Sequence, residues 1–125
     1  MQELIERLEK AEGPDRELDA EIWMTLHPEW REYPRADTDE FVKWETPIDG
    51  LVYLESCYTS SIDAALTLVP RNFLYSLARV GKHHRANVHK ADPFRPTPPK
   101  HTRHDVAAIA LVIAALKARM QKESE

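Results

Sequence analysis

The chain has 125 residues, of which 42% are apolar and 30% are charged. A chain of this length can bury enough apolar surface for one core, so we expect a single domain over residues 1–125. The lone cysteine, Cys57, excludes an intrachain disulfide, and the charged start of the chain lacks the apolar stretch of a signal peptide. The most apolar run, Val106 to Leu116, is too short to cross a bilayer. We therefore expect a cytoplasmic protein without a membrane anchor.

The net charge of −4 is unevenly distributed. Residues 1–50 carry fifteen acidic and six basic side chains, whereas residues 71–104 carry eight basic side chains and a single acid. Such an asymmetry can mark an interaction surface, and it also arises when the two blocks face each other within the fold. The acidic overall balance disfavours binding to duplex DNA.

The first quarter of the chain predicts two helices. Leu4, Ile5 and Leu8 recur at helical spacing, which predicts a helix over residues 2–12. Gly13 follows that helix, and Pro14 suits the first position of a second helix. His27 precedes a proline and so disfavours helical backbone, which ends the second helix there.

Residues 28–50 are punctuated by prolines and contain several aromatic side chains. We expect an ordered connecting segment here, with one short strand near Phe41–Trp44. A turn at Asp49-Gly50 then leads into a strand over Leu51–Leu54.

A short amphipathic helix is expected between Tyr58 and Pro70. Ser60 is suited to cap its first turn, and Asp63 stands three residues further on, where its carboxylate can complete a capping box. Pro70 closes the segment.

The last third predicts a hairpin and a long helix. Alternating apolar residues over 72–80 indicate a strand, residues 81–84 a hairpin loop, and residues 85–90 the partner strand. The proline-rich residues 91–100 suggest an extended crossing. Thr102 is then expected to cap a buried final helix over residues 103–121, with Asp105 as the carboxylate of its capping box.

The resulting order is α-α-β-α-β-β-α, which predicts an α+β fold with helices covering a small, mostly antiparallel sheet. Three segments carry a resemblance to a known family: Gly13-Pro14-Asp15-Arg16, Asp63-Ala64-Ala65-Leu66 and Ala114-Ala115-Leu116. They resemble the phage ABA sandwich domain family of small phage and prophage proteins. The resemblance implies helices on both faces of the sheet and a role inside a bacterial host cell. That family has no settled biochemical activity, so no site residue carries over from it.

The acidic half offers the leading functional hypothesis, which is the binding and inhibition of a host protein in a counter-defence role. Aromatic side chains among carboxylates can serve as anchors on a basic partner surface. The alternative for the same residues is a solvated loop whose aromatics pack inward. The candidate contacts are Trp30, Glu32, Asp39, Glu40, Phe41, Trp44 and Glu45.

The basic segment 79–104 offers an alternative from another class, a small-ligand binder for a nucleotide-like anion. A compact anion demands less positive charge than a duplex does. The candidate contacts are Arg79, Lys82, Arg85, Lys90 and Arg103.

Catalysis is less favoured than binding, because the chain has no glycine-rich phosphate loop and no recognisable nucleophile motif. We expect no cofactor and no resident metal. A metal-dependent enzyme that uses His89, His101 and His104 is the last-ranked hypothesis. The apolar final helix can complete either a monomer core or a homodimer interface.

Overall fold

The computed structural model describes residues 1–37, 42–46, 50–90 and 101–124. Within these ranges it has four α-helices and two separate three-stranded antiparallel sheets, which confirms the α+β fold class. We expected one sheet. Among the described strands, the pairs β2–β3 and β4–β5 do not join, and the short strands β1 and β6, which the sequence patterns did not predict, each add a third strand to one of them. The elements are α1 (Gln2–Lys10), α2 (Arg16–Leu26), the 3-10 helix η1 (Pro28–Glu32), β1 (Arg35–Asp37), β2 (Val42–Glu45), β3 (Val52–Leu54), α3 (Ile62–Leu66), β4 (Phe73–Val80), β5 (His83–Lys90), β6 (Thr102–His104) and α4 (Ala107–Ser124).

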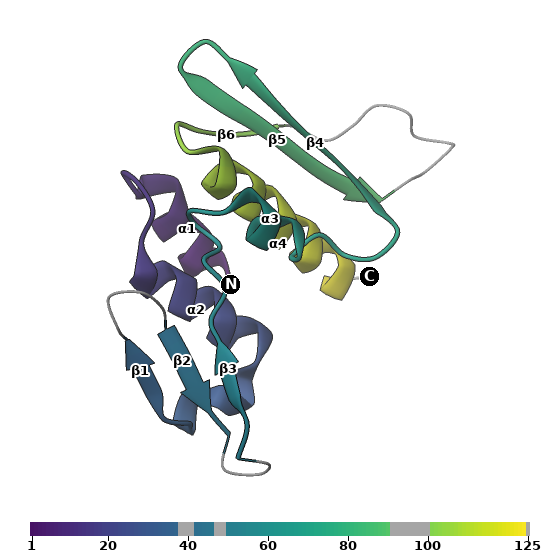
Figure 1. The fold of residues 1–125 in the computed structure, drawn as a ribbon. Helices are drawn as coiled ribbons and strands as arrows, with labels where there is room; N and C mark the ends of the chain where they lie inside the picture. Colours follow the sequence, from purple (N-terminus) through teal and green to yellow (C-terminus); the bar gives the residue numbers. More distant parts are fainter. Residues whose placement is uncertain (38–41, 47–49, 91–100, 125) are drawn as a thin grey trace.

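The central element of the core is α4, which is buried all round from Ala108 to Leu116. It packs against β5 and β6 on one side and against α1 and α3 on the other (Figure 1). A helix that is apolar on every face needs neighbours on every face, which this arrangement provides. The sheet β1–β2–β3 lies at the opposite end of the molecule from the β4–β5 hairpin, beside α2 (Figure 1). No helix in the described ranges is both long and apolar enough to span a membrane.

The resemblance implied helices on both faces of the sheet, and the described residues of β4–β5–β6 differ from that arrangement. Residues Ala86 and Val88 of β5 are buried on the face toward α4. On the other face, Leu74 and Val80 of β4 are exposed. The helix α4 therefore covers one face of this sheet.

The β4–β5 hairpin is tighter than expected. Val80 pairs with His83, so the loop contains only Gly81 and Lys82 rather than four residues. Gly81 has a φ of +64°, which suits the first central position of a two-residue hairpin turn and favours glycine there. The register then continues without interruption to the pair Phe73–Lys90.

The expected cap of the last helix is wrong. Thr102 pairs with Ala86 in β6, and its hydroxyl lies 2.7 Å from the Ala110 carbonyl of α4. His104 occupies the start of the helix instead: its Nδ1 accepts the Val106 N–H at 2.9 Å, and its Nε2 donates to the Ala11 carbonyl at 2.8 Å. The chain continues as a strand because these residues have a partner in β5, which local sequence cannot show.

The other two predicted helix starts shift by one or two residues. Ser61 rather than Ser60 caps α3, because the Ser61 hydroxyl accepts the Ala64 N–H at 3.2 Å. The second helix begins at Arg16, and the carboxylate of Asp15 accepts the N–H groups of its first turn. Both caps satisfy amide groups that the helix itself cannot pair.

A buried hydrogen-bond network fixes α2 to the segment that precedes α3. The Thr59 N–H donates to the Asp19 carboxylate at 2.8 Å, and the Asp15 N–H donates to the Thr59 hydroxyl at 2.8 Å. Burial raises the pKa of Asp19 above its usual value, and the hydrogen bonds from Thr59 partly oppose that rise. The folded protein therefore favours the neutral form of Asp19 more than the unfolded chain does.

Candidate functional site

An aromatic cluster fixes the β1–β2–β3 sheet to the helices. Trp30 of η1 lies at its centre, with ring centroids 5.3 Å from Trp23, 5.9 Å from Trp44 and 5.0 Å from Tyr53. All three contacts are edge-to-face, an arrangement that adds to the stabilisation from burial alone. The cluster joins α2, η1, β2 and β3, and so connects the sheet to the helical part of the fold.

A buried carboxylate provides the second anchor of this sheet. The Glu55 side chain, only 2% exposed, accepts the Trp44 indole N–H at 3.0 Å. Its two oxygens also accept from Arg35 at 3.3 and 3.2 Å, in a bidentate pair. A buried carboxylate needs such partners to offset its lost hydration. Arg35 belongs to β1 and Trp44 to β2, while Glu55 follows β3, so one side chain connects all three strands.

The third strand carries an exposed apolar run. Leu51, Val52, Tyr53 and Leu54 are consecutive and exposed, with 53% exposure for Val52 and 63% for Leu54. In the strand order β1–β2–β3, β3 pairs with β2 alone among the strands that the structure describes. Tyr53 pairs with Trp44 and faces the aromatic cluster, so Val52 and Leu54 lie on the opposite, outer face beside Lys43 and Glu45. We call Leu51, Val52, Tyr53 and Leu54 the β3 edge.

The predicted protein-binding residues do not form one surface. Trp44 is 1% exposed and belongs to the core, so it is not a surface anchor; its ring packs against η1 and its indole N–H is paired with Glu55. Trp30 is half-buried within the aromatic cluster. Glu32 and Glu45 are exposed. Asp39, Glu40 and Phe41 lie outside the described residues.

The sequence analysis did not identify the β3 edge as a candidate binding surface. Its four apolar residues predict a strand, and a strand without alternation is typical of one that is buried on both faces. One feature of the sequence could have indicated an edge strand: Leu51–Leu54 contain no charged residue and no proline. Natural edge strands commonly carry such residues, which prevent pairing with another chain.

The basic residues of the hairpin are only partly brought together. Arg85 and Arg103 are direct cross-strand partners of β5 and β6 and share the outer face of their sheet. Arg79 and Lys90 lie on the other face, near opposite ends of the hairpin, and Lys82 is in the turn. An eight-residue strand spans roughly 25 Å, so Lys82 and Lys90 cannot contact one compact anion.

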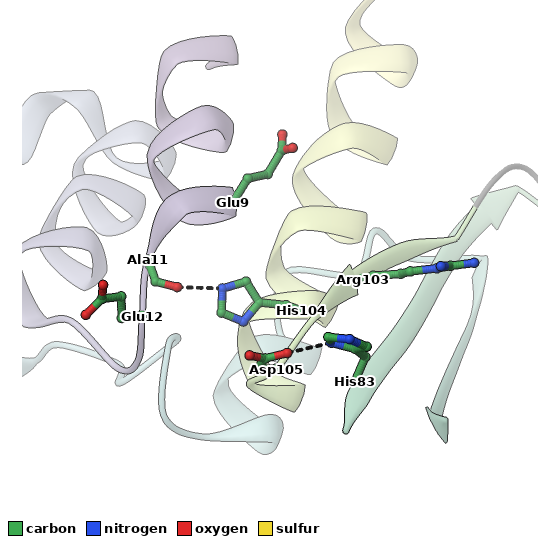
Figure 2. A pocket seen from close by; sticks show the side chains of 7 residues that line it. All are labelled: Glu9, Ala11, Glu12, His83, Arg103, His104 and Asp105. Atoms are coloured by element: carbon green, nitrogen blue, oxygen red, sulfur yellow. Dashed lines mark hydrogen bonds and ion pairs between the residues drawn. The ribbon is translucent and has the colours of Figure 1, made fainter. Parts of the chain in front are cut away.

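A pocket of about 460 Å³ lies where the α1–α2 connection meets β6. Its lining residues are Glu9, Ala11, Glu12, His83, Arg103, His104 and Asp105. Figure 2 shows His83 directed toward Asp105, with its Nδ1 2.5 Å from a carboxylate oxygen. Glu12 and Arg103 point away in opposite directions (Figure 2). The charged groups therefore do not converge, and the three carboxylates disfavour an anion in this pocket.

The histidines do not form a metal site within the described ranges, where no group of three or more potential ligands has a suitable arrangement. His104 is the clearest case. Its two ring nitrogens are already engaged with the backbone of Val106 and Ala11, so neither has a lone pair directed at a metal.

Neither a protein-family model, nor a curated protein, nor a solved structure matches this chain. The resemblance to the phage ABA sandwich domain family therefore rests on the three short segments quoted above.

Proposed function

We propose that this protein is a non-enzymatic accessory protein that binds a partner protein along the β3 edge. The observation that supports this function is the run of four consecutive exposed apolar residues formed by Leu51 and the three residues of β3, a strand that pairs with β2 alone among the described strands. Water-exposed apolar patches of this kind mark protein contacts more often than they mark catalytic sites. The occupant that fits is an extended segment of another protein, added to the sheet as a fourth strand.

The geometry favours strand addition over a helix in a groove. An edge strand presents N–H and C=O groups in a row, and an extended segment pairs with them while its alternate side chains contact both faces. On the outer face such side chains meet Val52 and Leu54, with Lys43 and Glu45 as the adjoining charges. The aromatic cluster and Glu55 hold β3 in place before binding, which reduces the entropy lost on association.

The resemblance to small phage proteins indicates the kind of partner to expect. It makes a cytoplasmic protein of the bacterial host the expected partner, and inhibition by occupancy the expected effect in counter-defence. The exposed carboxylates of Glu29, Glu32 and Glu45 favour a partner with a basic surface around its extended segment, because complementary charge speeds encounter.

Paired affinity capture tests the proposal. Tagged wild-type protein, a Val52→Lys/Leu54→Lys variant and an Ile62→Lys control are incubated with bacterial lysate, and the eluates are compared by quantitative mass spectrometry. All three substituted side chains are exposed, so the folds should remain intact. A protein enriched on the wild type and the control, yet lost from the β3 variant, supports the proposal. An identical set of proteins on all three baits contradicts it.

A second candidate function, the binding of a nucleotide-like anion, has one observation in its favour. Arg85 and Arg103 face each other across β5 and β6, where two like charges repel unless an anion lies between them. Within the described ranges neither guanidinium has a carboxylate partner. Isothermal titration with ATP and with inorganic phosphate, on wild type and on Arg85→Glu, separates this function from the first. Heat released by the wild type alone would support an anion site.

A further inference from the structure

The strand β4 forms a second unprotected edge, remote from β3. It has eight residues and stands at one end of the order β4–β5–β6, so among the described strands it pairs with β5 alone. Long edge strands are usually shielded by prolines, bulges or several charges, because an open row of backbone groups invites pairing with another chain. This strand has no proline and a single charged residue, Arg79.

Apolar side chains are exposed on both faces of this edge. Leu74 is 52% exposed and Val80 is 44% exposed on the outer face. Tyr75 is exposed on the inner face, because α4 lies chiefly under β5 and β6 rather than under β4. Among the described elements, α4 thus leaves the outer edge of β4 largely uncovered on this face.

We infer that β4 pairs with β4 of a second copy of this chain, antiparallel and with the two-fold axis at Leu77. The two sheets then join into one sheet of six strands. In this register Leu74 lies opposite Val80 of the second copy, Tyr75 opposite Arg79, and Ser76 opposite Ala78. Each of the three exposed large apolar residues of β4 gains a partner, and each pair occurs twice by symmetry.

The single charge on this strand disfavours an axis at Arg79 and is compatible with the axis at Leu77. A two-fold axis at Arg79 would place two guanidinium groups directly opposite each other, which is unfavourable. The axis at Leu77 instead places each Arg79 beside the ring of Tyr75 in the other copy, where a cation–π contact is favourable. The strand is thus complementary to itself, which points to a second copy as the occupant.

Among the described elements, α4 lies away from the proposed β4–β4 contact. A two-fold axis normal to the sheet keeps both α4 helices on the same side of the joined sheet. Each α4 lies under β5 and β6, so the two helices remain separated by the width of the two β4 strands. The β3 edge lies at the far end of each copy and stays accessible (Figure 1).

Sedimentation velocity over a concentration series tests the inference with the full chain. We expect the wild type to shift from 14.4 kDa toward twice that mass as concentration rises. Leu74→Lys and Val80→Glu should each weaken the dimer about tenfold. Each substitution places a charged side chain opposite an apolar one, and the two-fold symmetry repeats that unfavourable pair. An equimolar mixture of the two variants should recover it, since one interface pair becomes Lys–Glu and the other stays Val–Leu. Circular dichroism and urea unfolding of each variant confirm that its fold is intact.

The mixing experiment distinguishes the proposed register from other interfaces. Recovery in the mixture supports the register as well as the surface, because only opposition of positions 74 and 80 brings the new charges together. A wild type that stays monomeric at all concentrations overturns the inference. So does a dimer that persists in both variants, or one that Val52→Lys abolishes, because the interface would then lie elsewhere.

Discussion

Replacing Arg35 by methionine removes both hydrogen bonds from the guanidinium to Glu55 and leaves a carboxylate that is 2% exposed with the Trp44 indole as its partner. Breaking a buried ion pair from one side typically costs about 3–5 kcal/mol. The Arg35 side chain is 27% exposed, so water can partly replace it, and we expect the lower end of that range, about 3 kcal/mol. Methionine keeps an unbranched side chain but also removes the guanidinium, whose carbon lies 5.8 Å from the Trp44 ring centroid.

Urea unfolding followed by tryptophan fluorescence measures this effect. With a urea dependence of about 1–3 kcal/mol per M, a loss of about 3 kcal/mol should lower the midpoint of Arg35→Met by roughly 1–3 M. Adding Glu55→Gln removes the uncompensated charge while keeping an acceptor for Trp44, so the double variant should regain about 1–2 kcal/mol. An Arg35→Met variant within about 0.5 kcal/mol of wild type would refute the reasoning that Glu55 is an anchor of this sheet.

Three further predictions concern the folding scaffold. Because the pKa of Asp19 is raised above its ordinary value of 3.8, the folded protein holds the Asp19 proton to a higher pH than the unfolded chain does. The contribution of Asp19 to the free energy of unfolding therefore falls as the pH rises above 3.8. Wild type should therefore gain stability relative to Asp19→Asn between about pH 7 and about pH 4, as read from urea midpoints, and an unchanged difference would contradict the burial of this group. Ser61→Ala should lower the free energy of unfolding by about 1 kcal/mol while Ser60→Ala stays within about 0.5 kcal/mol, and the reverse order would restore the cap first expected from the sequence. Gly81→Ala should cost about 1 kcal/mol by thermal unfolding, since φ is +64° there, and a neutral result would contradict the hairpin turn.

The sequence was sufficient for most element types and insufficient for their pairing. Helical spacing in α1 and α4 and the alternation in β4 are local signals, and each of these elements forms where expected within a few residues. The strand β6 is different, because Thr102 has the residue type and spacing of a helix cap. It becomes a strand through pairing with Ala86 and through its hydrogen bond to Ala110, two contacts that no local pattern encodes.

In the candidate site, too, the sequence does not determine which side chains are buried and which are exposed. An aromatic residue among carboxylates suits a surface anchor and a core position equally well at the level of sequence. Trp44 is in the core because Glu55 satisfies its indole N–H and η1 covers its ring. Conversely, Val52 and Leu54 are exposed because no element of the described chain covers the outer face of β3. Burial of a strand is decided by its tertiary neighbours, which lie far from it in sequence.

Site-specific photo-crosslinking in bacterial lysate tests the central claim most directly. A benzophenone side chain is placed at position 54 on β3 or, as the matched control, at position 36 on β1; both positions are exposed and flank Lys43 on the outer face of the same sheet. A partner protein captured by strand addition at the β3 edge should crosslink strongly from position 54 and weakly or not at all from position 36. Equal crosslinking from both positions, or none from position 54, would contradict binding along β3.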